Sequence, residues 1–110
     1  MSQSNIPIYI DKGSYFVTTI IVTDENCLPR NLSNVIAKSY VKRTYNSLSF
    51  VEFDVIIDNP EQGEIRLEMD ADKTSNLKYQ RYVYDLIVEY DGIPERVIEG
   101  IVTVYPSVTS

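Results

Sequence analysis

Four acidic side chains surround one turn of the chain, and carboxylate oxygens are the ligands that calcium prefers. They are Asp54, Asp58, Glu61 and Glu64, and the turn between them, residues 58–63, contains asparagine, proline and glycine. The ligand spacing of an EF-hand loop is missing, and acidic residues are common in turns that face water. We therefore expect no bound metal here, and a calcium site remains the alternative.

A second acidic pair, Asp70 and Asp72, flanks Ala71. Two carboxylates can act as acid and base, or as acid and nucleophile, in the hydrolysis of a glycosidic bond. That chemistry also needs a substrate cleft, for which a domain of this size has little room. We expect these two residues to have a structural role.

The sequence lacks the residues for most nucleophilic and zinc chemistry. It contains no histidine, which excludes Ser-His-Asp and Cys-His systems and every histidine-containing zinc site. Its single cysteine, Cys27, cannot form an internal disulfide. We expect Cys27 to be a loop residue without a role, with pairing to another chain as the alternative. The expected protein is not an enzyme and has no cofactor.

Tyrosines are the most suggestive surface signal, because there are nine of them and one small core cannot bury them all. Tyrosine is enriched at protein interfaces, where its ring supplies apolar area and its hydroxyl a hydrogen bond. The interface candidates are Tyr40, Tyr90, Tyr45, Tyr105 and Asp85. Half-buried strand aromatics without a partner are the alternative, and Tyr40 and Tyr90 are the residues that we expect most at a subunit interface.

Asp85 stands out because it lies inside a strongly apolar strand pattern, where an unpaired buried carboxylate is costly. Either it faces solvent or makes a local hydrogen bond, or it contacts a partner protein. An ion pair with Arg81 or Arg96 is a further alternative.

Length and charge set the class of protein. The chain has 110 residues, which is one domain covering residues 1–110, and a net charge of −6. Acidic proteins repel nucleic acid and anionic membranes, so we expect neither as a partner. No apolar run reaches the roughly 20 residues of a membrane span, and the N-terminus does not read as a signal peptide. We expect assembly in a reducing cytoplasm.

Short runs of alternating apolar and polar residues, separated by turn signals, predict seven strands. They cover about residues 6–10, 15–23, 35–43, 50–57, 64–69, 82–90 and 94–104. Pro7 removes a backbone donor from the first run and so predicts an edge strand. Only residues 72–78 suit a helical turn, with Asp72 as its N-cap. Residues 107–110 are expected to be a frayed tail.

This pattern predicts an all-β fold, a seven-stranded antiparallel immunoglobulin-like β-sandwich with at most one short helical turn. Parallel strands would need crossover helices, for which no sequence remains. Tyr82 begins the sixth predicted strand, which is the position of the tyrosine corner in such domains, and Tyr84 takes the place of their second cysteine. The alternative is that Tyr82 is an ordinary strand aromatic.

Several short motifs follow one another along nearly the whole chain. They read IDKGS at 10–14, VTD at 22–24, PRNL at 29–32, GEIRL at 63–67, YVYDL at 82–86 and RVIEGIVTVYPSVT at 96–109. In this order they resemble small immunoglobulin-like virion proteins of tailed bacteriophages, such as the amino-terminal domain of phage baseplate upper proteins.

The resemblance implies a virion structural protein without catalysis, associated with the tail or baseplate. Its implied partners are other virion proteins and further copies of itself, in particles assembled in the host cytoplasm. A capsid decoration protein is one alternative. A free-standing module that binds carbohydrate or a host surface is another, but sugar-binding faces usually include tryptophan, and the chain has none.

Overall fold

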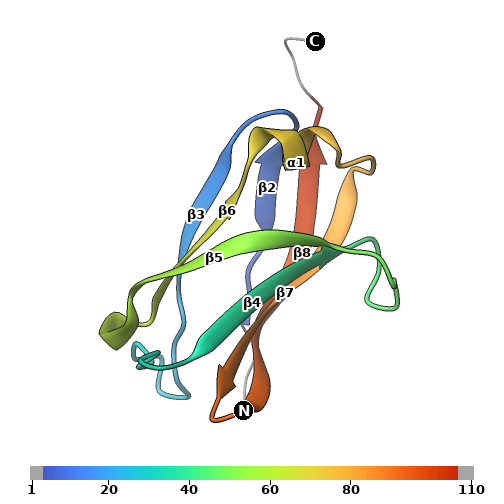
Figure 1. The fold of residues 1–110 in the computed structure, drawn as a ribbon. Helices are drawn as coiled ribbons and strands as arrows, with labels where there is room; N and C mark the ends of the chain where they lie inside the picture. The colour runs from blue at the N-terminus through green and yellow to red at the C-terminus, as the bar shows by residue number, and fades with distance from the viewer. Residues whose placement is uncertain (1–3, 107–110) are drawn as a thin grey trace.

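The computed structural model describes residues 4–106, which form eight strands and two short helical turns (Figure 1). In chain order the elements are β1 Ser4–Asn5, β2 Ile8–Asp11, β3 Phe16–Ile21, β4 Ile36–Lys42, β5 Val51–Asn59, the 3-10 turn η1 Pro60–Gln62, β6 Glu64–Met69, α1 Ala71–Ser75, β7 Arg81–Tyr90 and β8 Ile93–Tyr105. The predicted frayed tail at 107–110 lies outside the described residues. Neither helix in the described part has the length and apolar character needed to span a membrane.

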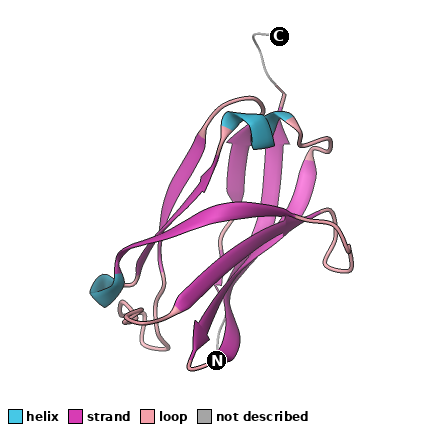
Figure 2. Cartoon of the chain, viewed as in Figure 1, coloured by secondary structure: helices cyan, strands magenta, loops and turns pink. Residues whose placement is uncertain are grey.

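The strands form two layers that face each other across a core (Figures 1 and 2). One layer runs in the order β1, β8, β7, β4 and the start of β5, with β2 also paired to β8; the other contains the end of β5, β6 and β3. Strand β5 belongs to both layers, because residues 51–53 pair with β4 and residues 54–59 pair with β6. The all-β immunoglobulin-like prediction is confirmed.

The sheet is mixed, so the prediction of purely antiparallel pairing was wrong at one edge. Strands β1 and β2 run parallel to β8, with Ile8 opposite Val102 and Ile10 opposite Val104. The connection from β2 to its parallel neighbour β8 needs no crossover helix, because strands β3 to β7 lie between them in the chain. The first predicted strand, residues 6–10, corresponds to β2, which begins at Ile8 just after Pro7, and β1 precedes it outside the predicted range. Strand β2 lies at an edge, as Pro7 indicated.

The core follows the predicted alternation. Apolar residues at every second position of β6 and β7 are buried while their neighbours are less so, because successive side chains of a strand point to opposite faces. The largest fully buried side chains are Tyr84, Ile10, Leu32, Ile65, Leu67, Met69, Leu77, Leu86, Ile98, Val41, Val88 and Val102. Each such burial contributes roughly 1.5–3 kcal/mol, so no disulfide is needed to hold the layers together.

The single α-helical turn begins one residue after Asp70, so the predicted N-cap was displaced by two residues. The Asp70 side chain accepts a hydrogen bond of 2.8 Å from the backbone N–H of Lys73. Asp72 lies in the first turn of α1 instead, where its negative charge interacts favourably with the positive end of the helix dipole. Thr74, which is buried, accepts from the N–H of Gly13 at 3.0 Å and donates to the carbonyl of Ser14 at 2.8 Å. The turn thereby fixes the loop between β2 and β3.

The tyrosine corner is present. The Tyr82 hydroxyl accepts hydrogen bonds from the backbone N–H groups of Lys78, at 2.8 Å, and Tyr79, at 3.1 Å. This is the local geometry by which immunoglobulin-like domains fix the corner before this strand. The corner positions residues 78–81 at the start of β7.

Candidate interaction surfaces

Three side chains form a row across the outward face of the first layer. Tyr40 on β4 is directly opposite Asp85 on β7, and Asp85 is directly opposite Glu99 on β8. Residues opposite one another in antiparallel strands share a face and lie within contact distance. Two of the predicted interface residues, Tyr40 and Asp85, are therefore neighbours.

The loop between β4 and β5 brings a third candidate, Tyr45, to the same face. The Tyr45 ring centroid is 5.9 Å from the guanidinium carbon of Arg96. Burial raises the pKa of the Tyr45 hydroxyl, and the nearby Glu99 carboxylate raises it further. Phe50 ends the loop edge-on to Tyr40, with ring centroids 4.8 Å apart. We call this surface, made by Tyr40, Tyr45, Phe50, Asp85 and Arg96, the outer face.

Asp85 points outward yet is only 8% exposed. Its Oδ2 lies 3.4 Å from Nε of Arg96, so Arg96 rather than Arg81 is its ion-pair partner. Its Oδ1 is buried without a hydrogen-bond partner among the described residues. Such an unmet acceptor typically costs about 1–3 kcal/mol. The pair with Arg96 therefore offsets only part of what it costs to bury this carboxylate.

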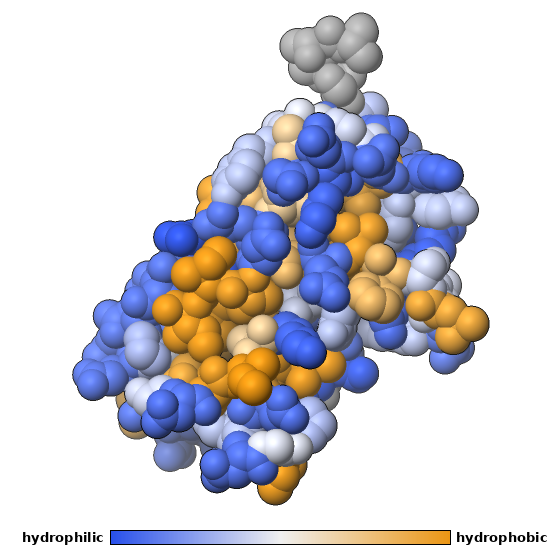
Figure 3. Space-filling model, in the orientation of Figure 1, coloured by the Kyte–Doolittle hydropathy of each residue, from blue (hydrophilic) through white to orange (hydrophobic). Residues whose placement is uncertain are grey.

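Beside the predicted candidate Tyr45, the β4–β5 loop exposes two apolar side chains that sequence patterns did not identify. Leu48 is 97% exposed, and Phe50 is about half exposed, at 50%, as is Tyr45, at 48%. The space-filling view shows apolar atoms on this projecting loop and a broader apolar patch over the region where β4 and β5 diverge (Figure 3). The two strands pair only from Ser39 to Val41. The sequence around Leu48 does not predict its exposure, because a single leucine in a polar loop can be either buried in the core or exposed to solvent.

Tyr90 and Tyr105 lie apart from the outer face. The Tyr90 hydroxyl donates to the carbonyl of Asn31 at 3.3 Å, and the Arg30 guanidinium lies 4.8 Å from its ring centroid. Tyr105, which is 47% exposed, stacks with Tyr9 at 6.2 Å. The structure thus brings Tyr40, Tyr45 and Asp85 together and places Tyr90 and Tyr105 elsewhere. That both Tyr40 and Tyr90 contribute to a subunit interface stays a prediction.

Among the described residues, β2 and β3 are edge strands that each pair on one side only, and the two-residue β1 continues the edge formed by β2. A groove of about 350 Å³ lies between them, lined by residues 6–9 and 16–21. Val17 and Ile21 beside it are 49% and 44% exposed. Free backbone edges of this kind can pair with an additional strand from a partner.

The acidic residues do not converge on a metal site. Asp58 forms an ion pair with Arg66, with 3.2 Å between Oδ2 and NH1, and Asp70 caps α1. Within residues 4–106, no group of three or more His, Cys, Asp or Glu side chains could hold a metal ion. Cys27 is exposed in the loop between β3 and β4, with a positive φ of 63°. Neither the calcium alternative nor a paired-carboxylate hydrolase gains support from this geometry.

The fold is shared with a domain from a bacteriophage. The chain is similar to a solved structure of the N-terminal domain of phage TP901-1 ORF48, with a TM-score of 0.60 and 11% sequence identity. The similarity covers 94% of this chain and 89% of that one. No protein-family model and no curated protein sequence matches the chain. At this identity the likeness establishes the fold, in agreement with the resemblance that the sequence motifs indicated.

Proposed function

We propose that this chain is a non-catalytic structural module of a tailed-phage particle, associated with the tail or baseplate, and that it acts by binding other virion proteins. The observation that carries the proposal is the structural likeness to a phage protein domain over 94% of the chain. The order of the sequence motifs points to the same group of proteins.

The outer face and its loop are the contact surface that we assign to this function. Leu48 is 97% exposed and lies in the same loop as the half-exposed Tyr45 and Phe50. Burying one leucine side chain in a partner would contribute roughly 1.5–3 kcal/mol. Aromatic residues are enriched at the centres of protein interfaces, and polar residues surround them at the rim. The chain also has no histidine for general acid-base work, which supports a non-catalytic role.

The location can be tested by immunogold electron microscopy of particles from the source lysate, together with mass spectrometry of the purified particles. Label at the tail end, with the chain present in the particles, supports the proposal. Label over the head would replace it with a capsid decoration role. If mass spectrometry finds the chain only outside intact particles, the virion role is wrong and a free-standing binding module becomes the leading candidate.

The contact surface can be tested separately with the variant Tyr45→Ser/Leu48→Ser. We expect it to fold normally, because both side chains are exposed, and to be lost from assembled particles. The matched control is Tyr15→Ser/Leu28→Ser, which removes residues 58% and 59% exposed elsewhere on the surface. Equal incorporation of both variants would contradict the assignment of the outer face.

A further inference from the structure

A basic groove lies at the end of the sandwich that carries α1. Its volume is about 620 Å³, and it is lined by Arg43, Lys78, Tyr79, Gln80, Arg81 and Thr103, none of which is acidic. A smaller hollow of about 200 Å³ shares three of these residues, Arg43, Lys78 and Tyr79. The side chains of Lys78, Tyr79 and Arg81 are exposed. In an acidic protein, this lining is unusual and favours an anionic ligand.

The groove is preorganised. The Arg43 guanidinium lies 4.5 Å from the ring centroid of Tyr79 and donates from NH1 to the carbonyl of Arg81 at 3.1 Å. The tyrosine corner holds the backbone of Lys78 and Tyr79 through the Tyr82 hydroxyl. A guanidinium has five N–H donors, so most of those on Arg43 remain available to a ligand. A groove fixed in advance loses little conformational entropy on binding.

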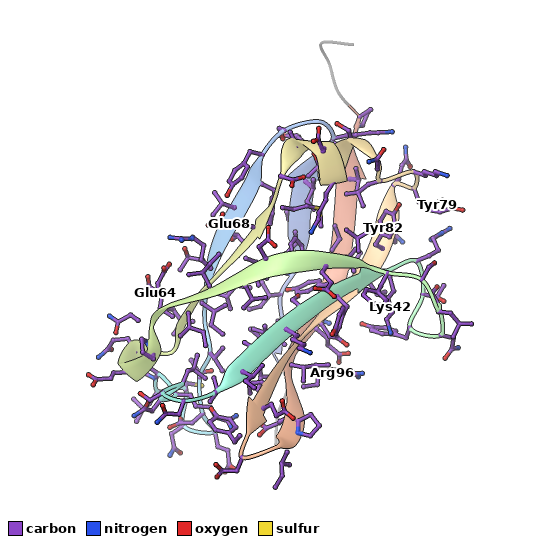
Figure 4. All side chains as sticks on the ribbon, in the orientation of Figure 1. Lys42, Glu64, Glu68, Tyr79, Tyr82 and Arg96 are labelled. Atoms are coloured by element: carbon purple, nitrogen blue, oxygen red, sulfur yellow. The ribbon has the colours of Figure 1, made fainter. Side chains whose placement is uncertain are left out.

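Charge differs between the two ends of β7. Basic residues gather where β4 ends and β7 begins, at Lys42, Arg43, Lys78 and Arg81. The hairpin at the other end of β7 carries Glu89, Asp91 and Glu95. Lys42 and Tyr79 lie on one side of the molecule and Glu64 on the other (Figure 4).

The tip of the β7–β8 hairpin suits this groove in charge and in the side chains that it exposes. Asp91 and Gly92 form a two-residue turn between Tyr90 and Ile93, with φ of +50° and +83°. Ile93, two residues after Asp91, is 71% exposed, and Glu89 precedes the turn on the other strand. The hairpin projects at the end away from α1 (Figure 1). It therefore combines a carboxylate with an apolar side chain, while the groove combines three cations with an aromatic ring.

We propose that the hairpin tip of one copy of this chain binds in the basic groove of a second copy. The Asp91 carboxylate pairs with Lys78 and Arg81, and Ile93 packs on the ring of Tyr79. Groove and tip lie at the two ends of β7, roughly 30 Å apart at about 3.3 Å per residue. The contact is head to tail, so it propagates from copy to copy into a ring or a filament. The contact depends on charge and on the exposed side chains of the two sites, and not on the proposed virion role, so either proposal can fail alone.

Sedimentation velocity of the purified full chain tests the contact over a range of protein concentrations. We expect association that grows with concentration at about 50 mM salt and weakens at about 500 mM, because salt screens exposed charges. Two variants each remove one half of the contact: Lys78→Glu/Arg81→Glu in the groove and Glu89→Gln/Asp91→Asn at the tip. Asparagine tolerates the positive φ at position 91. Each variant alone should associate at least about tenfold more weakly.

An equimolar mixture of the two variants is the decisive measurement. One variant retains an intact tip and the other an intact groove, so the mixture should form one-to-one dimers and nothing larger. The control Glu52→Gln/Asp54→Asn makes the same charge change on exposed positions of β5 and should associate as the wild type does. A wild-type chain that stays monomeric at low salt would overturn the proposal, even if the groove bound an acidic segment of another protein. Variants that still associate alone, or a mixture that does not, would also overturn it.

Discussion

The hydroxyl of Tyr84 donates a hydrogen bond of 2.5 Å to the carbonyl oxygen of Ile6, 78 residues earlier in the chain. Tyr84 is 1% exposed, and its ring packs edge-on against Phe53 with centroids 6.2 Å apart. Burial raises the pKa of this hydroxyl, which keeps it protonated as a donor. Tyr84 thus links the N-terminal edge of the sheet to the middle of the core, at the position where other immunoglobulin-like domains place a disulfide cysteine.

The first prediction removes this bond. Tyr84→Phe keeps the ring but leaves the Ile6 carbonyl without its donor, so we expect the free energy of unfolding to fall by about 1–2 kcal/mol. Urea denaturation measures the change. Tyr105→Phe, at an exposed ring, serves as the control and should change stability by less than about 0.5 kcal/mol. Equal effects of the two substitutions would show that the Tyr84 hydroxyl contributes nothing specific.

The second prediction concerns Gly100, which is directly opposite Tyr84 on β8. A Cβ at this position would collide with the backbone carbonyl of Ile6 and approach the Tyr84 ring to 3.0 Å. The chain before β2 is held close by the bond from the Ile6 N–H to the Glu99 carbonyl, 3.0 Å. We expect Gly100→Ala to cost about 1–3 kcal/mol by overpacking.

Hydrogen exchange distinguishes this collision from ordinary backbone strain. Gly92→Ala is the control, because its added Cβ would meet nothing within 4 Å although its φ is +83°. Both substitutions reduce stability, but only Gly100→Ala should speed exchange at the Ile6 N–H beyond what the loss of global stability explains. Normal protection of that N–H in Gly100→Ala would contradict the predicted displacement.

The third prediction tests the tyrosine corner. Tyr82→Phe leaves the N–H groups of Lys78 and Tyr79 without their acceptor, so we expect a loss of about 1–3 kcal/mol in unfolding free energy. Exchange should accelerate at those two N–H groups first. The same variant should weaken the association proposed for the basic groove, because Lys78 and Tyr79 line it. If hydrogen exchange at both N–H groups is unchanged, the tyrosine corner does not position the groove.

The fourth prediction is a pH dependence at the opposite end of the molecule. Arg30 donates to both carboxylate oxygens of Glu95 at 2.9 Å, and this hydrogen bonding lowers the pKa of Glu95. A lowered folded-state pKa means that the stabilisation is present above the ordinary pKa of a glutamate. It is lost as the pH falls through the lowered value. Partly exposed pairs contribute little, about 1 kcal/mol or less.

The measurement is the difference in unfolding free energy between the wild type and Glu95→Gln from neutral to acidic pH. We expect the wild type to be more stable at neutral pH and the difference to shrink in acid. Glu25→Gln, in an exposed loop, should show no such trend. A difference that grows as the pH falls would show that the sign of this linkage is wrong.

Much of the fold follows from local sequence. The alternation from Tyr82 to Tyr90 predicts β7 and its buried face, and Asp91-Gly92 predicts the hairpin turn, because both depend on neighbours in the chain. The tyrosine corner is also local, since Tyr82 reaches back only three and four residues. The helix cap was displaced because Asp70 and Asp72 are both good caps, and the register of α1 depends on how Thr74 meets the β2–β3 loop.

Only the tertiary structure decides the pairings between distant segments. The parallel pairing of β2 with β8, the ion pair of Asp85 with Arg96 and the exposure of Leu48 have no local signature. The basic groove is the clearest case, because Arg43 follows β4, whereas Lys78 lies in the loop before β7 and Arg81 begins that strand. Strand propensity and turn type are set by residues a few positions apart. Surfaces are set by which strands become neighbours, and that is determined by burial of the whole core.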